Sequence, residues 1–118
     1  MAKMKHISRK TLVESEGQLH TVGNNRQVQY LNKVFHGFLH GHNILQFCPF
    51  DMKLCIDDCG FPTRTTMMAI NDFIEFFEIS ARVSYAKGKT TLYWENAEIS
   101  GPYGQPITIT INVHGVAA

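Results

Sequence analysis

Several residue classes that mark specialised proteins are scarce in this chain of 118 residues. It has only three cysteines, an odd number, which argues against a secreted scaffold held together by disulfides. No apolar run approaches the roughly 20 residues that a transmembrane helix needs. No hydrophobic segment follows the basic first residues, so the start does not resemble a secretory signal. We therefore expect a cytoplasmic protein with reduced thiols and no membrane contact.

The motifs of common enzyme classes are also missing. The chain has no G-x-S-x-G, no glycine loop that would cradle a phosphate and no H-E-x-x-H. Cys55 or Cys59 is available as a nucleophile and His40 as a base, with Asp57 or Asp58 to orient it. No spacing places such a nucleophile beside the base. We predict that the protein is not an enzyme.

Histidines and cysteines are concentrated in the middle of the chain: His36, His40, His42, Cys48, Cys55 and Cys59. A zinc site usually takes its ligands as close pairs such as C-x2-C, whereas these cysteines are separated by six and then three residues. Free cysteine is also among the most buried residue types. We predict no metal and no cofactor, and a structural zinc site remains the open alternative.

Charge is distributed unevenly, although the net charge is only +1. Residues 1–33 hold six basic and two acidic side chains, and the remainder holds five basic and eight acidic ones. The opening "MAKMKHISRK" contributes Lys3, Lys5, Arg9 and Lys10 without an acid. Such a basic arm (1–10) neutralises phosphates in nucleic-acid-binding proteins. The alternative is a solvated terminus without a role.

The clearest helix is "RTTMMAINDFIEFFEI", residues 64–79. Its apolar side chains recur at the spacing of one helical face: Met67, Ile70, Phe73, Ile74 and Phe77. Thr63 or Thr65 supplies a hydroxyl that can accept a hydrogen bond from the free N–H groups of the first turn. We therefore predict an amphipathic helix that packs on a sheet.

Strand patterns lie on both sides of this helix. "KVFHGFLH", "NILQF" and "MKLCI" predict short strands upstream, and residues 11–33 are ambiguous. "ARVSYAKGKTTLYWE" predicts a hairpin around Lys87-Gly88, in which Val83 faces Leu92, Ala81 faces Trp94 and Arg82 faces Tyr93. "PITITINVH" alternates as a half-buried strand and completes a three-strand meander. We predict an α+β single domain (1–118) with a mostly antiparallel sheet and one main helix packed on it.

The outer face of the predicted hairpin presents Arg82 opposite Tyr93, with Lys87 and Lys89 at the tip. Aromatic rings stack on unpaired bases, and neighbouring cations hold the phosphates. The pair has a second interpretation, a cation–π contact across the strands that only stabilises the sheet.

The start of the predicted helix offers a second cationic position. Free backbone N–H groups and the helix dipole favour an anion there, and Arg64 would add a guanidinium to the hydroxyls of Thr63, Thr65 and Thr66. The alternative is a capped helix in which Arg64 pairs with Asp57 or Asp58.

Residues 38–95 show a resemblance to known proteins in "LHGHNILQFCPFDMKLCIDDCGFPTRTTMMAINDFI" and the hairpin after it. This stretch resembles small phage-encoded proteins with a G-[aromatic]-x-T-x-T-T…I-N signature. It is similar to the single-stranded-DNA-binding transcription cofactors of N4-related phages, small oligomers that work with a phage RNA polymerase. The resemblance implies a host-cell cytoplasmic location and supplies no contact residues.

These observations together predict a non-enzymatic protein that binds single-stranded nucleic acid. The phosphate contacts would come from seven cations: Lys3, Lys5, Arg9, Lys10, Arg64, Lys87 and Lys89. Tyr93 beside Arg82 would stack on bases. Because each chain has few cations, we expect a dimer or tetramer, joined through an exposed strand edge such as "PITITINVH". The competing prediction is a phage effector that binds and inhibits a host protein.

Overall fold

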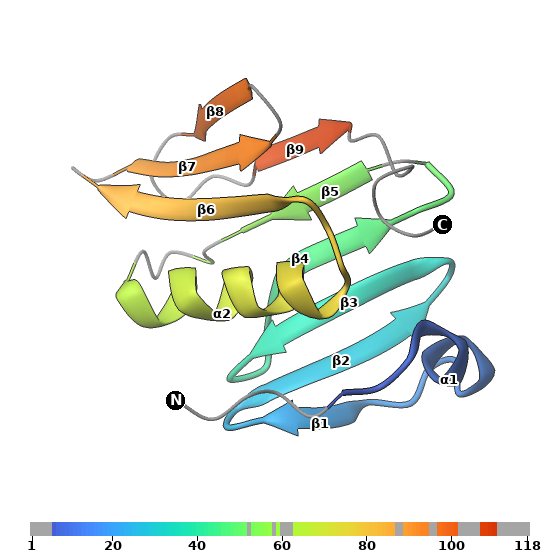
Figure 1. Ribbon diagram of the computed structural model, residues 1–118. Helices are drawn as coiled ribbons and strands as arrows, with labels where there is room; N and C mark the ends of the chain where they lie inside the picture. Colours follow the sequence, from blue (N-terminus) through green and yellow to red (C-terminus); the bar gives the residue numbers. More distant parts are fainter. Residues whose placement is uncertain are drawn as a thin grey trace.

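The structure is a computed structural model that describes residues 6–51, 53–57, 59, 63–86, 89–94, 97–101 and 107–110 (Figure 1). These residues form nine strands and two helices, joined by turns and loops. In chain order the elements are α1 (Arg9–Glu14), β1 (His20–Gly23), β2 (Arg26–Leu31), β3 (Val34–Leu39), β4 (His42–Cys48), β5 (Lys53–Ile56), α2 (Arg64–Phe76), β6 (Ala81–Ala86), β7 (Lys89–Trp94), β8 (Ala97–Gly101) and β9 (Ile107–Thr110). Neither described helix is long and apolar enough to span a bilayer.

The strands form two antiparallel sheets. Sheet A has six strands in the order β1-β2-β3-β4-β5-β9, and sheet B has three in the order β6-β7-β8. Helix α2 lies across β3 and β4 on one face of sheet A, and sheet B continues this layer beside the helix, with β8 next to β9 (Figure 1). The predicted α+β fold with one main helix on a mostly antiparallel sheet is confirmed.

Strand register produces the alternation that builds the core. Two rows of paired residues on sheet A point toward α2: Val28–Gly37–Leu45–Ile56 and Tyr30–Phe35–Phe47–Leu54. All of these residues are buried, as are Val83 and Leu92 of sheet B. Gly37 is required because a Cβ there would lie 2.8 Å from the ring of Phe73. One continuous core therefore joins both sheets and α2.

Helix α2 begins and packs as its sequence predicts. Thr63 is the N-cap, and its hydroxyl accepts a hydrogen bond from the N–H of Thr66 at 3.2 Å. The five apolar side chains of the predicted stripe are all buried: Met67, Ile70, Phe73, Ile74 and Phe77. The helix ends at Phe76, three residues before the end of the predicted segment.

The hairpin has the predicted register, whereas the last strand has a different partner from the predicted one. Val83 faces Leu92, Ala81 faces Trp94 and Arg82 faces Tyr93, as expected. The third strand of the meander is β8, which the sequence analysis did not identify. Strand β9, from "PITITINVH", instead pairs with β5 at the edge of sheet A. Residues 111–114 of that stretch lie outside the described residues.

The described part of the N-terminal region, from residue 6 on, includes a short helix. Residues 1–5 lie outside the described residues, but α1 already begins at Arg9, with Ser8 as its N-cap. Leu12 of α1 is buried in the core. Arg9 and Lys10 of the expected arm (1–10) therefore lie in a helix that packs on the core. The ambiguous stretch 11–33 contains the end of this helix and the strands β1 and β2.

Candidate nucleic-acid interface

The solvent face of the hairpin presents the predicted aromatic–cation pair. The guanidinium carbon of Arg82 lies 4.7 Å from the ring centroid of Tyr93. Arg82 is exposed and Tyr93 is half-buried, and the neighbouring pair Ser84–Thr91 lies on the same face. Lys89 is the first residue of β7, and its side chain, like all of Lys87, lies outside the described part of the chain.

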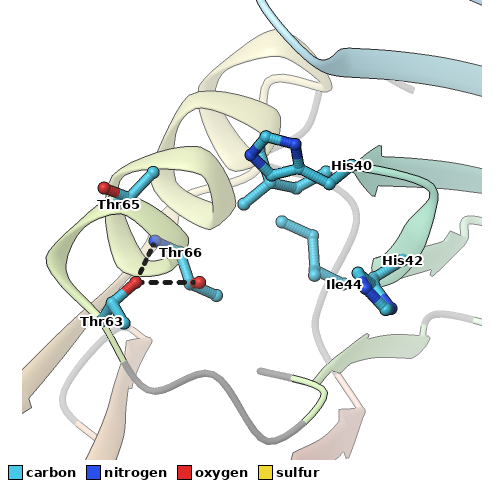
Figure 2. Close-up of a pocket in the computed structure, with 7 residues that line it drawn as sticks. His40, His42, Ile44, Thr63, Thr65 and Thr66 are labelled. Carbon is cyan, nitrogen blue, oxygen red and sulfur yellow. Dashed lines mark hydrogen bonds between the residues drawn. The ribbon is translucent and has the colours of Figure 1, made fainter.

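A pocket of about 400 Å³ opens at the start of α2 (Figure 2). Two segments form its walls: the first turn of α2 contributes threonines, and the β3–β4 turn contributes histidines. The lining residues are Leu39, His40, His42, Ile44, Thr63, Thr65 and Thr66. His40 adopts a left-handed backbone conformation (φ +51°) in the two-residue turn with Gly41. This tight turn places His40 and His42 across the pocket from the start of α2.

The chemistry of this pocket is polar at the rim and apolar beneath it. No carboxylate is among the described residues that line it, and the helix dipole adds partial positive charge. The hydroxyls of Thr63 and Thr66 lie 3.2 Å apart and already bond to one another. This arrangement is better suited to binding phosphate oxygens than to binding a cation.

Arg64 lies beside this pocket without lining it. It is the exposed first residue of α2. Among the described residues, the only ion pair joins Arg26 to Asp72, so Arg64 does not form the alternative pair with Asp57. Asp57 instead accepts a hydrogen bond from the N–H of Cys59 at 2.8 Å. Asp58, the other expected partner, lies outside the described residues. Within the described part of the chain, the exposed guanidinium of Arg64 has no ion-pair partner.

The N-terminal cations differ in their availability. The guanidinium of Arg9 donates to the backbone oxygen of Phe77 at the end of α2 and lies 5.3 Å from the ring centroid of Phe47. Burial lowers the pKa of Arg9, and the charge of Glu78 acts in the opposite direction. Arg9 is thus engaged within the fold. Lys10 is exposed, and Lys3 and Lys5 lie outside the described residues.

The histidines and cysteines of the middle segment do not converge. Among the described residues, no group of three or more His, Cys, Asp or Glu side chains lies close enough to hold a metal ion. The thiol of Cys48 faces Asp51, and the thiol of Cys59 donates to the backbone oxygen of Asn43 at 3.5 Å. His36 points to the opposite face of sheet A from α2, and Cys55 lies in the same row on that face, with Gln46 between them.

One exposed aromatic residue was not singled out in the sequence. Phe50 lies in the β4–β5 turn with 69% of its surface exposed. The ammonium of Lys33, from the β2–β3 turn, lies 5.9 Å from its ring centroid. The available signal was the turn stretch "CPF", in which an aromatic residue follows a proline and leaves the strand pattern.

Comparison of the chain with protein-family models, with curated proteins and with solved structures finds no match. Its function is therefore inferred from its own residues.

Proposed function

We propose that the protein binds single-stranded nucleic acid and catalyses no reaction on it. The observation on which this proposal depends is the Arg82–Tyr93 pair, 4.7 Å apart on the solvent face of β6 and β7. Bases that are not paired stack on aromatic rings and on guanidinium planes. Because Arg82 is exposed over a half-buried ring, its outer plane is open to a base and its N–H groups are open to a phosphate.

The start of α2 supports the proposal with further phosphate contacts. Helix α2 begins at the same end of the molecule at which β6 ends and β7 begins (Figure 1). Arg64, the threonine hydroxyls and Lys89 therefore belong to one end of the structure. A strand that stacks on Arg82 and runs toward this end would meet cations and free N–H groups along its backbone.

The proposal includes a homo-oligomer, a dimer or tetramer, because a chain with net charge +1 needs several copies to gather enough cations. The resemblance of residues 38–95 to phage single-strand-binding cofactors supports an extension of this role. In that extension the protein acts in the host-cell cytoplasm as a transcription cofactor beside an RNA polymerase.

The test is a fluorescence-anisotropy titration of labelled single-stranded and duplex oligonucleotides at about 50 and 200 mM salt. We expect tighter binding to the single strand and a steep loss of affinity with salt. Replacing Tyr93 by Ala should weaken binding about tenfold or more, because loss of one stacked base costs about 1–3 kcal/mol. Arg82→Lys retains the charge but loses the planar group, so it should also weaken binding.

Ser84→Ala is the matched control, because Ser84 lies on the same face beside the pair and has no ring or charge. Equal binding by Arg82→Lys and the unmodified protein would show that the stack has no role. Absence of binding at about 50 mM salt would contradict the proposal as a whole. A complex with a host protein that survives high salt would then be the expected alternative.

A further inference from the structure

The face of sheet A that points away from α2, here called the outer face, carries exposed and partly exposed side chains. Helix α1, helix α2 and sheet B all lie on the other side (Figure 1). Strand register arranges its side chains in three rows: Leu31–Val34–Cys48–Lys53, Gln29–His36–Gln46–Cys55 and Gln27–Phe38–Asn43. No described helix or strand covers these rows.

The described side chains of the three rows carry no negative charge. None of the side chains in the three rows is a carboxylate, and Lys53 is the one lysine or arginine among them. Asp51 and Asp57 lie in turns next to β4 and β5 and accept bonds from Cys48 and Cys59. Burial lowers the pKa of His36, so its ring is neutral near pH 7. A polyanion that approaches the middle of these rows meets no carboxylate among the described side chains, and the carboxylate of Asp51 lies at their Cys48 end.

Aromatic side chains are available at two places along this surface. The rings of Phe38 and His36 are stacked, with centroids 6.0 Å apart and planes inclined by 25°, and both residues are partly exposed. Phe50 stands at the end of the sheet at which β4 meets β5, with Lys33 over its ring. An aromatic ring next to a lysine provides both a stacking surface and a phosphate contact.

The polar groups between these aromatics favour nucleic acid over a second protein chain. Gln27 and Gln46 carry amides that can donate to and accept from the edges of bases, whereas the amide nitrogens of Gln29 and Asn43 bond to the Gly17 oxygen and to His36. The centre of a protein–protein interface is usually more apolar than this face, on which only Leu31, Val34 and Phe38 are large apolar side chains.

We propose that the outer face of sheet A is a second contact surface for the same single strand, whose bases lie against Phe38 and Phe50 and whose phosphates lie near Lys33 and Lys53. This inference rests on the proposed function and adds a site opposite the hairpin. From Val34 to Phe38 the surface extends about 13 Å along β3, at roughly 3.3 Å per residue. That length accommodates a run of a few nucleotides.

The first test places a negative charge in the middle of the face. Gln46 is exposed in the central row, and Gln18 is exposed in the loop before β1, so Gln46→Glu and Gln18→Glu change the net charge equally. We expect Gln46→Glu to weaken single-strand binding at least fivefold relative to Gln18→Glu at low salt. Gln46→Lys should strengthen it relative to Gln18→Lys.

The second test removes the exposed ring. Phe50→Ala should weaken binding several-fold, whereas Leu19→Ala, which removes another exposed apolar side chain, should not. Circular dichroism and urea unfolding establish that each variant folds as the unmodified protein does. Neither Phe50 nor Gln46 is in the core, so these substitutions are expected to leave stability unchanged.

The outcomes separate this inference from the proposed function. If the unmodified protein binds and Tyr93→Ala weakens it, but Gln46→Glu and Gln18→Glu bind equally, the outer face is not a contact surface and the hairpin proposal survives. If no strand binds, both proposals fail. If sedimentation shows that Gln46→Glu dissociates an oligomer of the free protein, the face pairs two copies and this inference is overturned.

Discussion

The side-chain amide of Asn71 on α2 bonds to both backbone polar groups of Val83 on β6. Its nitrogen donates to the oxygen of Val83 at 2.9 Å, and its oxygen accepts from the N–H of Val83 at 2.7 Å. The side chain thus takes the place of a neighbouring strand at the edge of sheet B. This contact fixes the position of α2 along β6, and therefore its position relative to the hairpin that bears Arg82 and Tyr93.

Replacing Asn71 by Ala should lower the free energy of unfolding by about 1–3 kcal/mol, because two backbone groups of Val83 lose their partner. The stability of Asn71→Asp should lie between those of the unmodified protein and Asn71→Ala, since a carboxylate still accepts from the N–H of Val83 but cannot donate to its oxygen. Urea denaturation measures the difference, and Glu75→Ala on the exposed side of α2 is the control. Equal stability of Asn71→Ala and Glu75→Ala would contradict this role.

The contact between Gly37 and Phe73 sets the distance between sheet A and α2. A methyl group at residue 37 would lie 2.8 Å from the ring carbons, so Gly37→Ala should destabilise the protein by about 1–3 kcal/mol. Phe73→Leu in the same chain should recover part of that loss. A double-mutant cycle by thermal or urea unfolding measures this coupling. Strictly additive effects on the free energy of unfolding would show that the added methyl group does not clash with the ring of Phe73.

Arg9 and Lys10 are neighbours in sequence but should respond differently to loss of charge. Arg9→Gln removes the bond to the Phe77 oxygen and the contact with Phe47, so we expect reduced stability with an unchanged salt dependence of strand binding. Lys10→Gln should leave stability unchanged and reduce the salt slope, if the exposed Lys10 contacts a phosphate. Urea unfolding and the salt titration of each variant distinguish the two effects.

Protonation of His36 should reduce stability under mildly acidic conditions. Desolvation is the main cause of its lowered pKa, opposed by hydrogen bonds from the backbone and from Asn43. The unfolded chain therefore takes up the proton first, at about pH 6.5. Stability from this group is complete above that pH and is lost as the pH falls toward the lower folded pKa.

The free energy of unfolding, measured between pH 7.5 and 5.5, should accordingly decline more steeply in the unmodified protein than in His36→Gln. His6→Gln, at an exposed position, should follow the unmodified protein. Parallel pH curves for the unmodified protein and His36→Gln would rule out this contribution.

Local patterns were sufficient for the elements whose partners are near in sequence. The stripe from Met67 to Phe77 predicted the buried face of α2, and the alternation around Lys87-Gly88 predicted the register of Arg82 with Tyr93. Strand β8, "AEISG", is short and contains a glutamate and a glycine, so it has no clear strand pattern. The pairing of β9 with β5 depends on tertiary packing, which alternation alone does not specify.

The candidate site divides in the same way. Thr63, Thr65 and Thr66 were recognised from the cap of the helix, but His40 and His42 join them only because the β3–β4 turn folds back toward α2. Arg9 looked like part of a free arm because its partner at Phe77 lies 68 residues away. The outer-face rows likewise follow from register across four strands.

The pairing of β5 with β9 has a consequence for the order in which the chain assembles. Strands β1 to β5 follow one another as neighbours, so their contacts are local and can form early. The edge of β5 that pairs with β9 stays unpaired until α2 and all of sheet B have been synthesised. Until then a growing chain exposes an unpaired strand edge next to Leu54 and Ile56, a state open to pairing with another molecule.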